Sequence, residues 1–152
     1  MAILRNLRYK AVSDWGSPFS PRPNSRLALA ADPGDAAGRV QSLSMFFEVV
    51  AAGDVGALHR HPTDEAIYIE DGELEVRIGD RVEMIGPGDV AFVPRTVPHG
   101  WRNLGPSALR FRAVFASDLI GMERLARTPE LDEKPDPQQI AWIDVRAALT
   151  RS

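Results

Sequence analysis

The chain contains no cysteine among its 152 residues. Disulfide bonds, thiolate nucleophiles and cysteine-ligated zinc are therefore excluded. Long apolar runs are also missing: no stretch approaches the ~20 apolar residues of a membrane-spanning helix. Residues 1–20 contain no continuous apolar segment of the kind found in signal peptides. We therefore expect a cytoplasmic protein with no membrane partner.

The formal net charge is −3 and the sequence pI is about 5.6. Nucleic-acid binding requires a basic face, so we expect no nucleic-acid partner. An apolar fraction of 44% in a chain of this length is enough to build one domain with a real core.

Proline and glycine, twelve of each, divide the chain into short segments. Several of these segments alternate apolar and polar residues, as in the run from Glu73 to Ile78, which is the pattern of a half-buried strand. Many short strands at close spacing predict an all-β sandwich or barrel. The expected strands cover residues 26–30, 43–50, 65–70, 73–78, 81–85, 89–93 and 109–115.

The last quarter of the chain has a different pattern. Apolar residues at helical spacing predict a helix over residues 118–127, with Ser117 as its N-cap. The sequence of residues 136–139 is typical of a capping box and predicts a second helix carrying Ile140 and Ile143.

Histidine is scarce, and all three copies take part in one spaced pattern. His59 and His61 are two residues apart, Glu65 follows, and His99 comes later. Imidazole nitrogen and carboxylate oxygen are common ligands of transition metals. Side chains at i and i+2 share one face of a strand, whereas on a helix they would point about 200° apart. We therefore expect a strand that turns both histidines toward one metal ion.

Two longer motifs surround these four residues. The first is Gly53-x5-His59-x-His61-x3-Glu65-x6-Gly72, and the second is Gly88-x5-Pro94-x-Thr96-x2-His99-x3-Asn103. Together they resemble the two signature motifs of the cupin superfamily, in the short spacing of small single-domain bacterial cupins.

One position departs from the family pattern, because Thr96 stands where cupins usually have glycine. A β-branched residue tolerates positive φ poorly. Pro94 and Pro98 on either side could hold this loop in another conformation. The direction of the His99 side chain is therefore less firmly predicted than the directions of the other three candidate ligands.

The resemblance implies a double-stranded β-helix, or jelly-roll barrel, with short C-terminal helices. We divide the chain into an N-terminal arm and strand (1–40), the β-barrel (41–116) and a helical tail (117–152), all within a single domain. The implied cofactor is a divalent transition metal, one of Fe, Mn, Ni, Zn or Cu. Its ligands would be His59, His61, Glu65 and His99.

Strand parity makes further predictions about this barrel. If Glu65 points inward, Ile67 and Ile69 do so too, whereas Tyr68 faces outward. If His99 points inward, Trp101 does so too, and we expect it to lie in the core or the pocket wall. On the final helix, Trp142 is expected to anchor the tail by packing.

The resemblance also implies an activity on a small organic molecule. Dioxygenase-like oxidoreductases of the quercetinase type are our first expectation, and metal-dependent isomerases or cyclases are an alternative. A non-catalytic sensor that binds a small molecule is the other class. In an enzyme, Glu65 would be both a metal ligand and the general base, because no other histidine, cysteine or lysine is placed to accept a proton.

The N-terminal third holds more apolar strand material than one barrel face needs, in residues 27–29 and 45–49. Exposed apolar strand faces indicate an interface, and two-fold dimers are the commonest oligomers. We therefore expect a homodimer with residues 1–50 at the interface and the metal sites opening away from it. The alternative is that Ile140, Trp142 and Ile143 cover this strand.

Overall fold

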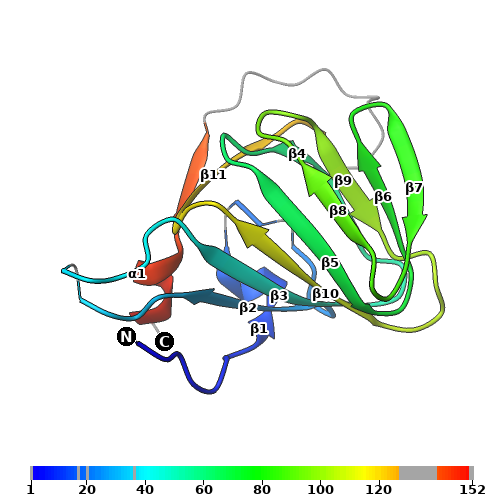
Figure 1. The fold of residues 1–152 in the computed structure, drawn as a ribbon. Helices are drawn as coiled ribbons and strands as arrows, with labels where there is room; N and C mark the ends of the chain where they lie inside the picture. Colours follow the sequence, from blue (N-terminus) through cyan, green and yellow to red (C-terminus); the bar gives the residue numbers. More distant parts are fainter. Residues whose placement is uncertain (1, 17, 20, 36, 127–139, 151–152) are drawn as a thin grey trace.

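The computed structural model describes residues 2–16, 18–19, 21–35, 37–126 and 140–150. Two antiparallel sheets of six strands face each other in these residues (Figure 1), with the orders β1-β2-β3-β10-β5-β8 and β12-β11-β4-β9-β6-β7. This is the predicted all-β, double-stranded β-helix. The first sheet contains β1 (Lys10–Ala11), β2 (Arg26–Ala31), β3 (Ser44–Val50), β5 (Glu65–Asp71), β8 (Val90–Val93) and β10 (Leu109–Phe115). The second contains β4 (Val55–Arg60), β6 (Leu74–Ile78), β7 (Arg81–Ile85), β9 (His99–Arg102), β11 (Leu119–Arg124) and β12 (Ala141–Asp144).

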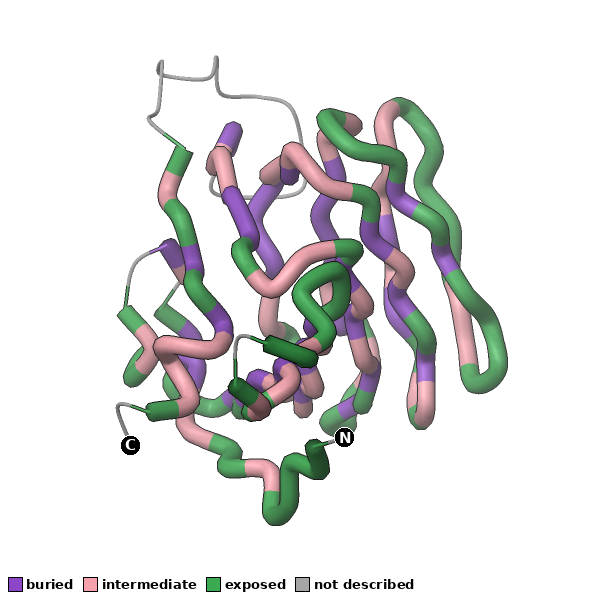
Figure 2. Tube along the Cα trace, turned by 60° about the vertical axis from the view of Figure 1, so that its left-hand side comes forward, coloured by how far each residue is buried: buried purple, intermediate pink, exposed green. Residues whose placement is uncertain are grey.

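The core lies between the two sheets and is made by strand alternation. In β10, Phe111 and Phe115 are buried whereas Arg110 is exposed. In β5, Ile67 and Ile69 are buried beside Glu65 and Tyr68 faces outward, as the parity argument predicted. The tube in Figure 2 shows the same alternation of buried and exposed residues along the strands.

In the second sheet, the close packing of the Trp101 side chain against strand β4 depends on a glycine, Gly56. Gly56 in β4 lies opposite Trp101 in β9. A Cβ atom at Gly56 would be 2.3 Å from Cε2 of Trp101, closer than real Cβ atoms come to other atoms. Trp101 can therefore lie flat across β4, and only 5% of it remains exposed.

The helix predicted over residues 118–127 is wrong, because residues 119–124 form strand β11. The three-residue spacing of apolar side chains suggested a helix, but β11 pairs with β12 on one side and with β4 on the other. This pairing places Ile120 opposite Ile143, and both side chains are buried. Tertiary pairing thus outweighs a weak local periodicity.

The second predicted helix is also largely wrong. Ile140 lies outside any element, Ile143 belongs to β12, and a single short helix, α1, covers Val145–Thr150. The proposed capping box at residues 136–139 lies outside the described residues. Trp142 is 57% exposed and does not anchor the tail. A four-residue 3-10 helix, η1 (Val12–Trp15), was not expected.

The apolar residues of β2 are covered within the chain itself. Leu27, Ala28 and Leu29 are almost fully buried, and α1 packs against this strand (Figure 1). Residues 27–29 were part of the reason for expecting a homodimer, but their side chains are not exposed and cannot form the interface. Within the described ranges, neither helix has the length and hydropathy needed to cross a bilayer.

Candidate metal centre

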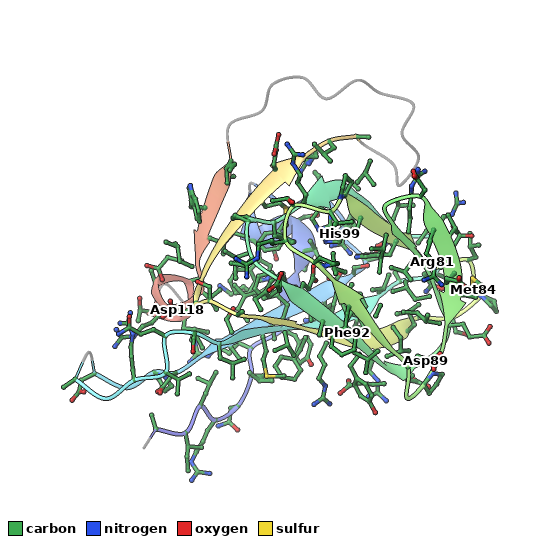
Figure 3. All side chains as sticks on the ribbon, turned by 45° about the horizontal axis from the view of Figure 1, so that its top comes forward. Arg81, Met84, Asp89, Phe92, His99 and Asp118 are labelled. Carbon is green, nitrogen blue, oxygen red and sulfur yellow. The ribbon has the colours of Figure 1, made fainter. Side chains whose placement is uncertain are left out.

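The three histidines meet in the interior, each at or near the end of a strand. His59 lies in β4, His61 follows one residue after its end, and His99 begins β9. One ligand atom from each ring lies within 4.8 Å of the others, an arrangement that could hold a metal ion. Figure 3 shows His99 inside the molecule, between the sheets, whereas Arg81 lies at the outer edge on β7.

Backbone carbonyl groups orient all three rings in the same way. The Nδ1 atoms of His59, His61 and His99 lie 2.6 Å, 2.7 Å and 3.0 Å from the carbonyl oxygens of Ala57, Gly121 and Val97, respectively. Such contacts place the proton on Nδ1 and leave the Nε2 lone pair free for a metal. In their neutral forms, the three imidazole rings therefore present their Nε2 atoms to one centre.

Glu65 completes this cluster from the start of β5. Its Oε2 atom lies 2.9 Å from Nε2 of His99 and 3.6 Å from Nε2 of His61. Oε2 of Glu65 and Nε2 of His99 are buried, and their geometry is not that of a hydrogen bond. A metal ion bound by both atoms would satisfy these two buried electron-pair donors. The donor set, three imidazoles and one carboxylate, fits a divalent transition metal.

The electrostatics of the cluster differ from ring to ring. Burial, followed by the neighbouring His99 and His61, holds the pKa of His59 well below its usual value. Burial also lowers the pKa of His61, although Glu65 opposes this effect. His59 and His61 are therefore neutral near pH 7, which is the form that binds metals.

Glu65 and His99 shift each other in opposite directions. Burial alone would raise the pKa of Glu65, but the charge of His99 outweighs it and the pKa is lowered. Burial would lower the pKa of His99, but Glu65 outweighs it and the pKa is raised. Glu65 is consequently a carboxylate at neutral pH, as a metal ligand must be.

The loop before His99 keeps a left-handed residue despite the absence of glycine. Thr96 has φ of 68°, so the alternative conformation considered for Pro94 and Pro98 is not adopted. The amide nitrogen of Thr96 donates a hydrogen bond of 2.7 Å to the carbonyl oxygen of His61. This contact ties the loop to the backbone of His61, which stabilises the strained conformation of Thr96.

We predict that Thr96→Gly stabilises the protein by about 1 kcal/mol, because glycine adopts this φ without steric strain. The side chain of Thr96 is exposed, so its removal loses no buried contact. The melting temperature should rise by about 2–4 °C in a thermal scan. Thr96→Ala is the matched control and should gain less, since it keeps a Cβ atom. A lower melting temperature for the glycine variant would show that Thr96 is not strained.

A cavity of about 60 Å³ opens beside the histidines. Space of this size holds a few water molecules or a small ligand. Trp101 forms part of the wall, as predicted. The other lining residues include His59, His61 and Glu65, the apolar Phe46, Ala57, Phe111, Ala113, Phe115 and Met122, and the charged Arg22, Glu48 and Arg124.

The charged residues of this wall were missed by sequence reasoning. Arg22 lies outside the expected strands, and Glu48 lies within the expected strand 43–50, for which no charged role was predicted. Gly121, whose carbonyl oxygen orients His61, was assigned to a helix. A glycine in the middle of that supposed helix was the available signal against it.

Two opposed antiparallel sheets with a histidine cluster between them define the class as a double-sheet β-barrel with a candidate metal centre. Residues 46–115 match the model of the cupin domain. Over this segment, which is somewhat less than half of the chain, the protein is similar to cupins. No curated protein matches this chain.

Solved structures show the same fold at low sequence identity. An RmlC-like cupin from Shewanella frigidimarina is 17% identical, with a TM-score of 0.57 over 76% of this chain and 88% of that one. A variant of oxalate decarboxylase from Bacillus subtilis is 20% identical, with a TM-score of 0.60, but only 30% of its chain is covered. The DMSP lyase DddQ from Ruegeria pomeroyi is 22% identical, with a TM-score of 0.58 over 74% of this chain and 57% of that one. These similarities show the fold alone.

Proposed function

We propose that this chain is a metal-dependent enzyme acting on a small organic molecule, with His59, His61, Glu65 and His99 as the metal ligands. The observation that carries the proposal is the buried contact between Glu65 Oε2 and His99 Nε2, which lie 2.9 Å apart without hydrogen-bond geometry beside the other two rings. Their Nδ1 atoms are already engaged, so the cluster is oriented for a cation. Enzymes are among the proteins with a similar fold, but their low identity does not transfer an activity.

A transition metal bound there would supply a Lewis acid and, if redox-active, an electron carrier. The protein's own residues do the rest. The carbonyl groups of Ala57, Val97 and Gly121 fix the ring orientations. The aromatic walls limit the entry of water, and Glu65 holds a carboxylate in position to accept a proton.

The direct test is the metal content of protein purified without added metal, measured by elemental analysis. We expect about one transition-metal ion per chain, and expect it to be lost in the His59→Ala variant. Protein that neither retains nor takes up Fe, Mn, Ni, Zn or Cu would contradict the proposal.

We propose a dioxygenase-like activity, so oxygen-dependent oxidation is the first reaction class to test. A cavity of about 60 Å³ supports a substrate much smaller than a flavonol. Oxygen consumption by the Fe-, Mn-, Ni- and Cu-loaded forms with a panel of small organic acids and alcohols would detect it. Tight ligand binding with no turnover in any metal form would instead favour the sensor class.

We predict that Glu65→Gln keeps a coordinating oxygen but lowers turnover by about 100-fold or more, because the amide cannot accept a proton. Metal content measured in parallel separates this effect from loss of the ion. Glu75→Gln is a matched control that should retain activity. Glu75 lies in β6 and forms an ion pair with Arg102 of β9, away from the proposed ligands. Wild-type turnover by a metal-loaded Glu65→Gln variant would place the base elsewhere.

We also propose a homodimer with the N-terminal segment at its interface. Support comes from five exposed apolar side chains in this segment: Ile3, Leu4, Tyr9, Val40 and Leu43. Light scattering at micromolar concentration should give twice the 16.7 kDa of one chain.

Leu43→Asp should convert this dimer to a monomer, because it would bury a charge in the interface. Phe92→Asp is the matched control: Phe92 is 75% exposed on β8, in another part of the surface, and its substitution should leave the dimer intact. Dissociation by the Phe92 change alone would assign the interface to β8 and overturn the N-terminal one.

A further inference from the structure

A buried arginine stands in the cavity wall with an unused donor. Arg22 is only 8% exposed, and Nη1 of its guanidinium pairs with Oε1 of Glu48. Its Nε atom is buried, and no hydrogen-bond partner for it occurs among the described residues. Burying a charged donor without a partner is unfavourable, so a bound ligand or water that accepts its hydrogen bond would stabilise this arrangement.

Two contacts fix Arg22 in this position, and a third anchors the chain that follows it. Its guanidinium lies over the ring of Trp101, 4.6 Å from the centroid. Glu48 holds one end of it from strand β3. The following chain is anchored by Ser25, whose hydroxyl group donates to the Asp54 carboxylate and accepts from the amide of Ala51. A guanidinium held on two sides loses little further freedom when its remaining edge binds a ligand.

The charge of the cavity favours an anion once the metal is bound. Two guanidinium groups, Arg22 and Arg124, balance the two carboxylates, Glu48 and Glu65, among the lining residues. The positive charge of a divalent ion at the histidines is then left uncompensated. Apolar and aromatic walls around it strengthen its attraction for an opposite charge.

We infer that Arg22 is the specificity-determining residue of the cavity and that it binds the carboxylate of a small organic acid. The ligand contains about five heavy atoms, in keeping with the volume of about 60 Å³. One carboxylate oxygen accepts a hydrogen bond from the guanidinium group of Arg22, which lines the cavity, and the rest of the molecule extends toward the histidines. This inference rests on the proposed function, because the metal supplies the uncompensated charge.

Propionate and propionamide are suitable probes, since they have the same size and differ in charge. Dissociation constants for both are measured on the zinc-loaded protein from the chemical shift of the Trp101 indole group, which lies beside Arg22. Wild type should prefer propionate by about tenfold or more, as expected for a charge-assisted hydrogen bond. Arg22→Gln should remove most of this preference, and Arg22→Lys should restore only part of it.

Glu48→Gln should change the propionate affinity in the opposite direction to Arg22→Gln. The glutamine keeps an oxygen that can accept from Nη1 and hold Arg22 in place, but it removes the negative charge that competes with a ligand, so propionate should bind several-fold more tightly while propionamide changes little. The double variant Arg22→Gln with Glu48→Gln leaves no unpaired buried charge and should show no preference, which keeps the test decisive if Arg22→Gln alone does not fold. Arg81→Gln, at an exposed ion pair on β7, is the matched control and should behave as wild type.

Zinc binding is measured first by calorimetry in every variant, so that the two proposals fail differently. Failure of the wild-type chain to bind zinc or another transition metal would overturn the proposed function. Normal metal binding with an unchanged preference for propionate in Arg22→Gln, or in the double variant, would overturn the role of Arg22 alone. Loss of propionate binding on Glu48→Gln would also overturn it.

Discussion

Replacing His61 with alanine should lower the affinity for a transition metal by at least about 100-fold, or ~2.7 kcal/mol. His61 is 3% exposed, and the Gly121 carbonyl group orients its ring, so no solvent-exposed side chain can move in to replace it. Removing one of the four proposed ligands would also leave only Glu65, His99 and His59 to hold the ion. Calorimetric titration of the metal-free protein with zinc would measure the change.

A loss of structure must be distinguished from the loss of a ligand in this experiment. The metal-free His61→Ala variant should unfold within a few degrees of the metal-free wild type, whereas the stabilisation gained on adding zinc should largely disappear. Arg81→Ala, at the rim on β7, should leave both quantities unchanged. Wild-type zinc affinity in a folded His61→Ala variant would exclude this residue from the metal site.

Much of the barrel could be predicted from the sequence because its strands alternate strictly. Ile67 and Ile69 are buried on the side of Glu65, and Tyr68 is exposed, as a period of two requires. The meeting of His59, His61 and His99 followed from the same reasoning combined with the cupin resemblance. These features depend on local spacing, which a sequence displays directly.

Contacts set by tertiary pairing could not be predicted in this way. Residues 119–124 carry a spacing that is compatible with a helix, and only their pairing with β4 and β12 makes them a strand. The role of Gly121 in orienting His61 depends on that pairing. Likewise, the position of Arg22 over Trp101 joins residues far apart in the chain, and neither sequence segment contains a sign of the other.

The second large effect concerns the aromatic support beneath the metal centre. We predict that Phe115→Ala destabilises the protein by about 3–5 kcal/mol, the usual range for truncating a buried phenylalanine. Phe115 is 2% exposed and its ring packs against Phe46 at 4.7 Å and against His61 at 5.1 Å between centroids. Denaturant unfolding of the metal-free protein would measure the loss, which should lower the melting temperature by roughly 10 °C or more.

Phe92→Ala is the matched control, since it makes the same chemical change at a side chain that is 75% exposed in β8. Its effect should stay within about 0.5 kcal/mol. Because Phe115 also contacts a proposed ligand, its truncation should weaken zinc binding by freeing the His61 ring, whereas the Phe92 change should not. Equal effects of the two substitutions on stability would mean that the ring of Phe115 does not support the core between the sheets. An unchanged zinc affinity in Phe115→Ala would mean that the Gly121 carbonyl group alone is sufficient to orient His61.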